Sequence, residues 1–291
     1  MQKINYEIIT KLIKNNVTKN EINLLTYIAH FQDEYGQVRG VHYREVCKSL
    51  NCSVQGFYDA LCGLEKKEII TVTHKMSDFD ISILNNNAIQ TNNFEHGYIS
   101  LSCKVFRTEE YNELPAKAKL LLMILLREDA ILKKNTKQKS DSLIRNRQKF
   151  IERFAGNAKK PGELFVSAKS VRQYLTMLKF ALDIYFEDEK WFITFKSDMI
   201  CREDESDTLR QQQIETAMRR NRIKVSKKTS GLKRKLQVFT SLIKKAANFD
   251  LSEIIREAIQ KKNPKNKNPY KWRRDIYLTE IEEIFSRVLL C

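Results

Sequence analysis

Polar and apolar positions alternate with a helical period in the first part of the chain. Thr18 and Glu21 fit a capping box, in which each side chain accepts a hydrogen bond from the other residue's backbone N–H. The apolar positions that follow share one helical face: Ile22, Leu25, Ile28 and Ala29. A glycine-containing break at 36–40 then separates this helix from the next elements.

After the break, the pattern predicts two further helices and a hairpin. A short helix spans 42–50, with Val46 and Leu50 on one face, and Ser53 is placed to cap the next helix. The apolar stripe expected for that second helix is Val54, Phe57, Leu61 and Leu64. Two β-branched runs, 69–73 and 81–84, are then expected to pair as strands, joined by a loop at 75–80.

The order helix, helix, turn, helix, hairpin resembles a winged helix-turn-helix. The residues SVQGFYDALCGLEKKEIITV, 53–72, resemble the recognition helix and first wing strand of MarR-like and related bacterial winged-helix proteins. The resemblance covers roughly 17–86. One departure is Glu68, at a position where such proteins often have glycine. This resemblance implies a DNA-binding module with a helix that enters the major groove.

Residues 97–197 repeat this pattern. A helix is expected to start at Pro115 and to continue through the apolar run 116–126, and a second helix is expected at 141–154. Ser167 is the expected N-cap of a third helix, whose apolar stripe is Val171, Leu175, Leu178 and Leu182. A hairpin is expected over 184–195. Two winged helices in tandem resemble the architecture of some plasmid replication initiators as well as some transcription regulators.

These patterns divide the chain into three regions. We predict an N-terminal winged-helix domain at 1–92, a second winged-helix-like domain at 97–197 and a basic helical C-terminal region at 207–291. The expected fold class is mainly α, with small β-hairpin wings. Apolar stripes in the third region indicate a helical bundle or a homodimer interface.

Positive charge is concentrated in the third region. The formal net charge is +16, from 52 Lys and Arg against 36 Asp and Glu. Residues 207–291 hold 21 basic and 9 acidic residues, a surplus of 12, whereas residues 1–206 hold 31 and 27. Such an asymmetry favours a polyanionic partner, and nucleic acid is the most common one. A basic helical surface that only confers solubility is the alternative.

Sequence motifs for catalysis are absent. There is no glycine-rich phosphate loop and no G-x-S-x-G elbow, and the 6 cysteines include no C-x-x-C pair. The 4 histidines share no metal-ligand spacing. We therefore expect no cofactor, no metal and no enzymatic activity. The chain shows no secretory segment and no apolar run of membrane-spanning length, which predicts a cytoplasmic protein without a disulfide framework.

The candidate DNA contacts are the residues of the predicted helices that remain when the buried apolar stripes are set aside. A recognition helix needs polar or small residues on its exposed N-terminal face. In the first domain the candidates, including phosphate contacts from the preceding helix and the wing, are Tyr43, Arg44, Lys48, Ser53, Gln55, Gly56, Tyr58, Asp59 and Lys75. In the second domain they are Lys169, Ser170, Arg172, Gln173 and Thr176. The densest basic runs of the third region add Arg219, Arg220, Arg222, Lys233, Arg234 and Lys235.

Two of these residues have the best match to base edges. Gln55 can bond adenine through two contacts, and Arg172 can bond guanine through O6 and N7. The second hairpin loop carries Glu187, Asp188 and Glu189, which would repel phosphates. That wing therefore either points away from the duplex or belongs to a dimerisation module; the sequence favours neither alternative.

The sequence thus predicts sequence-directed binding of duplex DNA. Both a bacterial transcription regulator and a replication initiator of a plasmid or mobile element fit this chemistry. The competing class is a non-enzymatic scaffold that binds protein partners through its winged helices. An RNA-binding role is a further alternative.

Overall fold

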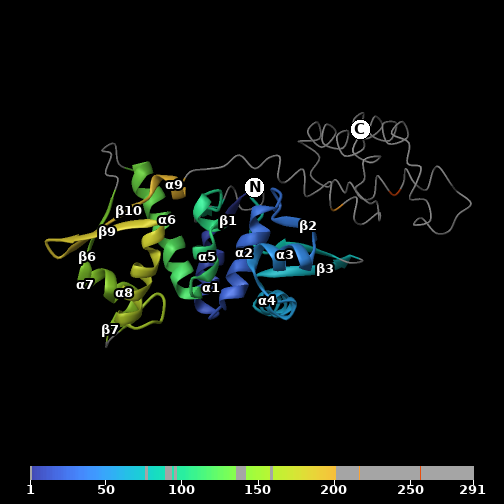
Figure 1. The fold of residues 1–291 in the computed structure, drawn as a ribbon, viewed down its shortest axis with the longest axis horizontal. Helices are drawn as coiled ribbons and strands as arrows, with labels where there is room; N and C mark the ends of the chain where they lie inside the picture. The colour runs from blue at the N-terminus through green and yellow to red at the C-terminus, as the bar shows by residue number, and fades with distance from the viewer. Residues whose placement is uncertain are drawn as a thin grey trace, which may run out of the picture. The chain divides into compact units, whose positions relative to one another are not determined.

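The computed structural model describes residues 2–75, 78–88, 94, 97–135, 142–157 and 160–200, together with 216 and 256. About 54% of the confidently placed residues are helical and 24% are in strands, spread over several small sheets. The prediction of a mainly α fold is therefore wrong, and the chain is an α/β mixture. Strands outside the two expected hairpins account for the difference (Figure 1).

The first elements are a short strand and two helices. Strand β1 (Lys3–Asn5) leads into α1 (Tyr6–Lys14), and α2 spans Lys19–His30. The predicted capping box at the start of α2 is confirmed: Thr18 Oγ1 accepts from the Glu21 N–H, and Glu21 accepts from the Thr18 N–H. The predicted apolar face of α2 is buried throughout.

The next elements form a three-stranded sheet with two helices. Strand β2 (Gln37–Val41) precedes α3 (Tyr43–Leu50) and α4 (Val54–Lys66), which Ser53 caps as predicted. Strands β3 (Ile70–Lys75) and β4 (Asp78–Ile83) form the expected hairpin, and the sheet order is β2-β4-β3. Strand β2 lies where the sequence indicated only a break, because its partner strand lies about forty residues further along the chain.

One position of the predicted stripe in α4 is wrong. Phe57, Leu61 and Leu64 are buried, but Val54 is 47% exposed. Val54 is the first residue of the helix, and the buried residues of α4 begin with Phe57. The stripe therefore begins one turn later than its spacing predicted.

A connecting set of elements follows. Strand β5 (Tyr98–Ser100) pairs with β1 in antiparallel register. A 3-10 turn η1 (Lys104–Arg107) and a short helix α5 (Glu109–Glu113) then lead to α6 (Ala116–Asn135). The run 120–126 is buried within α6, which packs against α8 as well as α1 and α2 (Figure 1).

The second α/β module repeats the order of the first. Strand β6 (Leu143–Asn146) precedes α7 (Arg147–Ala155), the two-residue strands β7 (Gly156–Asn157) and β8 (Lys160–Pro161), and α8 (Ala168–Met177). After the turn η2 (Leu178–Phe180), strands β9 (Leu182–Glu187) and β10 (Lys190–Phe195) form the expected hairpin, followed by α9 (Ser197–Ile200). The sheet order is β6-β10-β9, and Ser167 caps α8 as predicted.

The helix predicted over 141–154 is wrong in its first part. Residues Leu143–Asn146 pair with β10, and α7 begins only at Arg147. Asn146 ends the strand and caps the helix, with its side chain accepting from the Lys149 N–H. Four residues thus belong to the sheet because a strand far along the chain supplies their hydrogen bonds.

The two modules share a buried polar seam. Tyr111 is fully buried, with its hydroxyl 3.1 Å from Thr26 Oγ1 of α2. Asn112 O accepts from Asn23 Nδ2 of α2 at 3.1 Å and from Lys119 Nζ of α6 at 3.0 Å. Lys119 is fully buried, and this burial lowers the pKa of its ammonium to about 7.

The described residues fall into two compact units. The described residues of Met1–Val38, Tyr43–Val72 and Ile81–Glu203 belong to one compact unit. Arg39–His42 and Thr73–Asp80 belong to a second unit. The predicted helical region at 207–291 lies outside the described residues, apart from 216 and 256.

Candidate nucleic-acid interface

Helices α4 and α8 carry the candidate base-reading side chains, and we call them the candidate recognition helices. Each begins with a serine N-cap: Ser53 Oγ accepts from the Gly56 N–H, and Ser167 Oγ accepts from the Ser170 N–H. These caps hold the first turn of each helix in place. The exposed polar side chains of that turn are therefore attached to a backbone whose conformation the cap stabilises.

The exposed face of α4 contains a side-chain pair one turn apart. Gln55 Nε2 donates to Asp59 Oδ1 at 2.7 Å, and both residues are exposed. One carboxamide N–H is occupied by this bond, whereas the second N–H and Oε1 are left for a ligand. The contact orients Gln55 before any partner arrives.

A second cluster joins α3 to α4. The rings of Tyr43 and Tyr58 lie 6.2 Å apart, and Arg44 Nε donates to the Tyr43 hydroxyl at 3.0 Å. Arg44 and Tyr58 are exposed, and so is Lys48 on the last turn of α3. The structure thus brings the predicted phosphate-contact residues of α3 beside the start of α4. Lys75 is exposed at the end of β3, in the other compact unit.

The exposed face of α8 is more basic. Lys169, Arg172 and Gln173 are exposed, and no ion pair or side-chain hydrogen bond joins any of them to another described residue. Ser170 Oγ lies 2.9 Å from Ser167 Oγ, and Thr176 Oγ1 donates to the Arg172 carbonyl at 3.1 Å. Unlike Gln55, Arg172 has no side-chain hydrogen bond to a described residue that would orient it.

Alignment of the two N-cap serines relates the helices position by position. The buried pairs are Phe57 with Val171, Leu61 with Leu175, and Leu64 with Leu178. The exposed pairs are Gln55 with Lys169, Tyr58 with Arg172, and Asp59 with Gln173. The same buried spacing therefore presents two different exposed faces.

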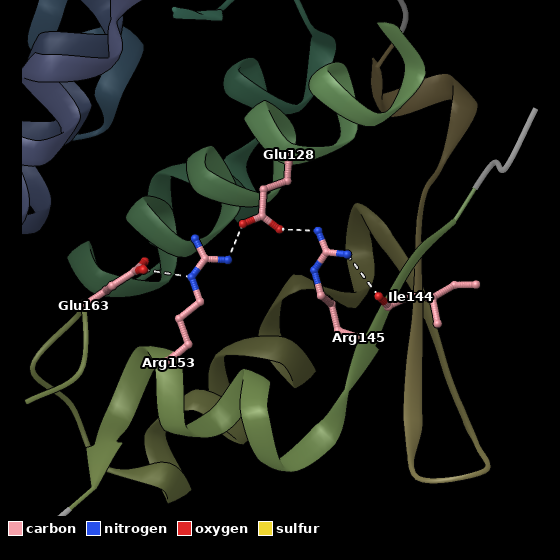
Figure 2. A network of polar contacts seen from close by, with 5 residues as sticks. All are labelled: Glu128, Ile144, Arg145, Arg153 and Glu163. Atoms are coloured by element: carbon pink, nitrogen blue, oxygen red, sulfur yellow. Dashed lines mark hydrogen bonds and ion pairs between the residues drawn. The ribbon is translucent and has the colours of Figure 1, made fainter. Parts of the chain in front are cut away.

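Not every arginine of the second module is free for phosphate. Glu128 of α6 accepts from Arg145 Nη2 at 2.9 Å and from Arg153 Nη1, and Arg153 Nε also donates to Glu163 at 2.8 Å (Figure 2). Glu128 is largely buried. The network fixes α6, β6 and α7 to one another. It also neutralises two cations that net charge alone would assign to a polyanion.

Sequence reasoning missed other cations of this module. Arg147 and Lys149 are exposed in the first turn of α7, and Lys160 is exposed in β8. None forms an ion pair with a described residue. Arg147 starts α7 as Tyr43 starts α3, so it occupies the place of a predicted phosphate contact. Asn146, a good N-cap after an alternating run, was the signal that could have placed this helix start.

The β9–β10 hairpin, the predicted second wing, is acidic at its turn. Glu187, Asp188 and Glu189 are exposed, and the two central residues of the turn have φ of 45° and 58°. Arg147 lies beside this wing, since its N–H donates to the Glu189 carbonyl at 3.0 Å and its guanidinium is 5.2 Å from the Phe186 ring centre. A cation thus accompanies the three carboxylates.

The described residues offer no cluster that could hold a metal ion, because no three of their His, Cys, Asp or Glu side chains are suitably placed. His30 is buried at the end of α2, and its two ring nitrogens have no hydrogen-bond partner there. Burial, followed by the charge of Arg107, lowers the pKa of His30 to about 4.

The candidate contacts of the third region lie outside the described residues. They are Arg219, Arg220, Arg222, Lys233, Arg234 and Lys235. Within the part of the chain that is described, no helix has the length and apolar character needed to cross a bilayer. Comparisons with protein-family models, curated proteins and solved structures found no match.

Proposed function

We propose that this protein binds duplex DNA in a sequence-directed manner through two winged-helix modules. The observation that carries the proposal is the repeated order helix, strand, helix, helix, strand, strand, in which each module exposes a serine-capped helix with a polar face. In a winged helix-turn-helix this helix enters the major groove. The protein would act as a bacterial transcription regulator or as a replication initiator of a plasmid or mobile element.

Gln55 is the proposed adenine contact of the first module. Its free Nε2 N–H can donate to N7 and its Oε1 can accept from N6–H, while Asp59 holds the other N–H. An oriented amide loses less conformational freedom on binding than a mobile one. Tyr43, Arg44 and Lys48 of α3 would contact phosphates and fix the position of the helix.

Arg172 is the proposed guanine contact of the second module. Its guanidinium matches guanine O6 and N7, and Lys169 on the same helix and Arg147 at the start of α7 add positive charge to the module. The acidic tip of the second wing opposes a close approach to phosphates. In this proposal the α8 face binds DNA and the tip of the wing stays outside the groove.

Selection from a random duplex pool tests the proposal. The full chain should enrich a defined sequence. Gln55→Ala and Arg172→Ala should each weaken binding to that sequence by about 1–3 kcal/mol and leave binding to random DNA nearly unchanged. Gln148→Ala is the matched control, because Gln148 donates to Glu152 at 2.9 Å with the same spacing but outside the recognition helices. A chain that enriches no sequence would refute sequence-directed binding.

A salt series distinguishes contacts to phosphates, which position the protein, from contacts to base edges, which read the sequence. Replacing Lys233, Arg234 and Lys235 by Gln should weaken enriched and random DNA alike and flatten the dependence of affinity on salt. Fluorescence anisotropy across a salt series measures both effects. If Gln55→Ala also weakens binding to enriched and to random DNA by the same amount, α4 does not read bases.

A protein-binding role for the second module is the other candidate. Ile144, Phe192 and Tyr185 are paired across the sheet on one face, and the rings of Tyr185 and Phe192 stack at 4.6 Å. Ile144 and Tyr185 are 46% and 52% exposed. An exposed apolar face beside an acidic tip suits a protein partner or a homodimer contact. Tyr185→Ser would then change sedimentation or partner binding without changing DNA affinity.

A further inference from the structure

Helix α3 ends in a Schellman motif that places two cysteines together. Asn51 takes a left-handed conformation, with φ of 49°, and the Cys52 N–H donates to the Cys47 carbonyl at 3.1 Å. In this motif the residue after the left-handed position contacts the residue five places before it, and the pair is usually apolar. Here that pair is Cys47 and Cys52.

The end of α4 shows the ordinary form of the same motif. Glu68 is the left-handed residue, with φ of 53°, and the Ile69 N–H donates to the Leu64 carbonyl at 3.0 Å. Leu64 and Ile69 are both buried. At the end of α3 the two side chains are thiols instead, and both are only half-buried.

We propose that Cys47 and Cys52 form a reversible dithiol–disulfide site in the helix-turn-helix, and that its oxidation lowers the affinity of α4 for its DNA sequence. The first part depends only on the two cysteines, whereas the second part rests on the proposed function. A disulfide requires Cα atoms within about 7 Å. Standard bond lengths and the Cys52–Cys47 backbone hydrogen bond already keep the two Cα atoms within about that limit.

Both thiols are partly open to solvent. Cys47 and Cys52 are each half-buried, so a small disulfide reagent can approach them from the surface. Burial and the neighbouring Cys47 raise the pKa of the Cys52 thiol to about 11, so Cys52 keeps its proton at neutral pH.

The exchange is balanced with glutathione disulfide as the oxidant. The Cys47 thiolate attacks one glutathione sulfur, forms a mixed disulfide and expels one glutathione thiolate. Cys52 then loses its proton, attacks the Cys47 sulfur and expels the second glutathione. Two electrons pass from the cysteines to glutathione, and the two cysteine protons end on two glutathione thiols.

The effect on DNA follows from the position of Cys52. Ser53, the next residue, caps α4, and Gln55 lies two residues further. Closing a sulfur–sulfur bond of about 2.05 Å draws Cys52 toward α3 and displaces this cap. The first turn of α4 would then lose its alignment with the base edges.

Peptide mapping tests the covalent step on the full chain. The Cys62→Ser variant removes the exposed third cysteine of this region, since Cys62 lies on α4. After equilibration in glutathione buffers, alkylation and trypsin digestion, peptides 45–48 and 49–66 should be linked, and dithiothreitol should separate them. If both cysteines are alkylated at every glutathione ratio, the proposed site is overturned, whether or not the protein binds DNA.

Anisotropy on the same samples tests the consequence. Oxidation should lower the affinity for the enriched sequence about tenfold, which is comparable to the loss of one bidentate base contact. Dithiothreitol should restore the affinity, and Cys47→Ser and Cys52→Ala should remove the redox effect. Linked peptides with equal affinity in both states would overturn the regulatory part. If no sequence is enriched in either state, the proposed function and its regulation fail, while linked peptides still support the disulfide site.

Discussion

Helices α4 and α8 can be compared residue by residue from their N-cap serines. Both bury apolar side chains at the fourth, eighth and eleventh positions after the cap, from Phe57 to Leu64 and from Val171 to Leu178. The exposed positions differ, with Gln55 and Tyr58 in α4 where α8 has Lys169 and Arg172. Packing against the rest of a module therefore fixes the spacing of the buried side chains and leaves the exposed face open to vary.

The charge around the two helices differs as well. The first module has exposed His74 and Lys75 near the end of its hairpin, whereas the second has three carboxylates at the turn. The more basic helix thus lies in the module with the more acidic wing. If both helices bind DNA, we expect the second to depend more on α7 and α8 and less on its wing.

The largest expected effect comes from the shared buried positions. Leu61→Ala and Leu175→Ala should each cost about 3 kcal/mol in unfolding free energy, because both side chains are buried in equivalent packing. Urea unfolding measures the two losses. Val54→Ala is the control and should cost under about 0.5 kcal/mol, because Val54 is exposed. A large loss only at Leu61 would break the proposed equivalence.

Acid should affect the first module before the second. The folded state holds the pKa of His30 at about 4, below its ordinary value of 6.5. Between pH 6.5 and pH 4, His30 is protonated in the unfolded chain but neutral in the folded chain. The free energy of unfolding is therefore highest above pH 6.5 and falls by up to about 3 kcal/mol as the pH falls toward 4. All 4 histidines lie within residues 1–96, so the second module has no histidine to bind a proton in this pH range.

The pH effect is checked by urea unfolding at pH 7 and pH 5. His30→Leu should reduce the loss of stability between the two pH values, whereas His74→Gln, an exposed control, should not. An unchanged loss in His30→Leu would assign the acid sensitivity to carboxylates instead.

A smaller effect should separate Gly63 from its counterpart Met177. A Cβ on Gly63 would lie 2.0 Å from Glu21 Oε1. Glu21 cannot easily move, because it is buried, caps α2 and accepts from Lys67 Nζ at 2.6 Å. Gly63→Ala should therefore destabilise the chain by about 2 kcal/mol.

Met177→Ala provides the comparison, since Met177 is 38% exposed. Its cost should stay under about 0.5 kcal/mol in the same unfolding experiment. If Gly63→Ala stabilised the helix instead, as alanine does in an open helix, the close approach of α2 to α4 would be refuted.

The smallest effect is an expected gain. Glu68 is left-handed, and a non-glycine residue there costs about 1 kcal/mol, so Glu68→Gly should raise stability by about that amount. The exposed ion pair to Lys11 that is lost contributes little. Glu189→Gly should give a similar gain in the second hairpin. Glu65→Gly, inside α4, should instead cost about 1 kcal/mol.

Local signals predicted much of the fold. The capping box at Thr18, the caps at Ser53 and Ser167 and the presence of both hairpins were correct because each depends on residues close in sequence. The loop predicted at 75–80 was wrong in extent, because β4 already begins at Asp78. Strands β2 and β6 were missed because each is defined by a distant partner strand. The two missed edge strands, together with the short pairs β1–β5 and β7–β8, turned an expected mainly α chain into an α/β mixture.

The candidate site was predictable to a similar extent. The exposure of Gln55 and Arg172 followed from the buried stripes, and the spacing of Gln55 and Asp59 already allowed their contact. The contact of Tyr43 with Tyr58 depends on how α3 packs against α4. The pairing of Arg145 and Arg153 with Glu128 depends on three elements at once, so sequence charge could not reveal it.

The buried seam has a consequence for dissecting the protein into fragments. A piece that stops at residue 92 leaves β1 without its partner strand β5 and removes Tyr111 from the hydroxyl of Thr26. A piece that begins at residue 97 lacks α2, so Tyr111, Asn112 and Lys119 lose the side chains that α2 packs against them. Each half would expose an unpaired strand edge, which invites aggregation. Soluble fragments are therefore expected only from cuts that keep α2, α5 and α6 on one polypeptide.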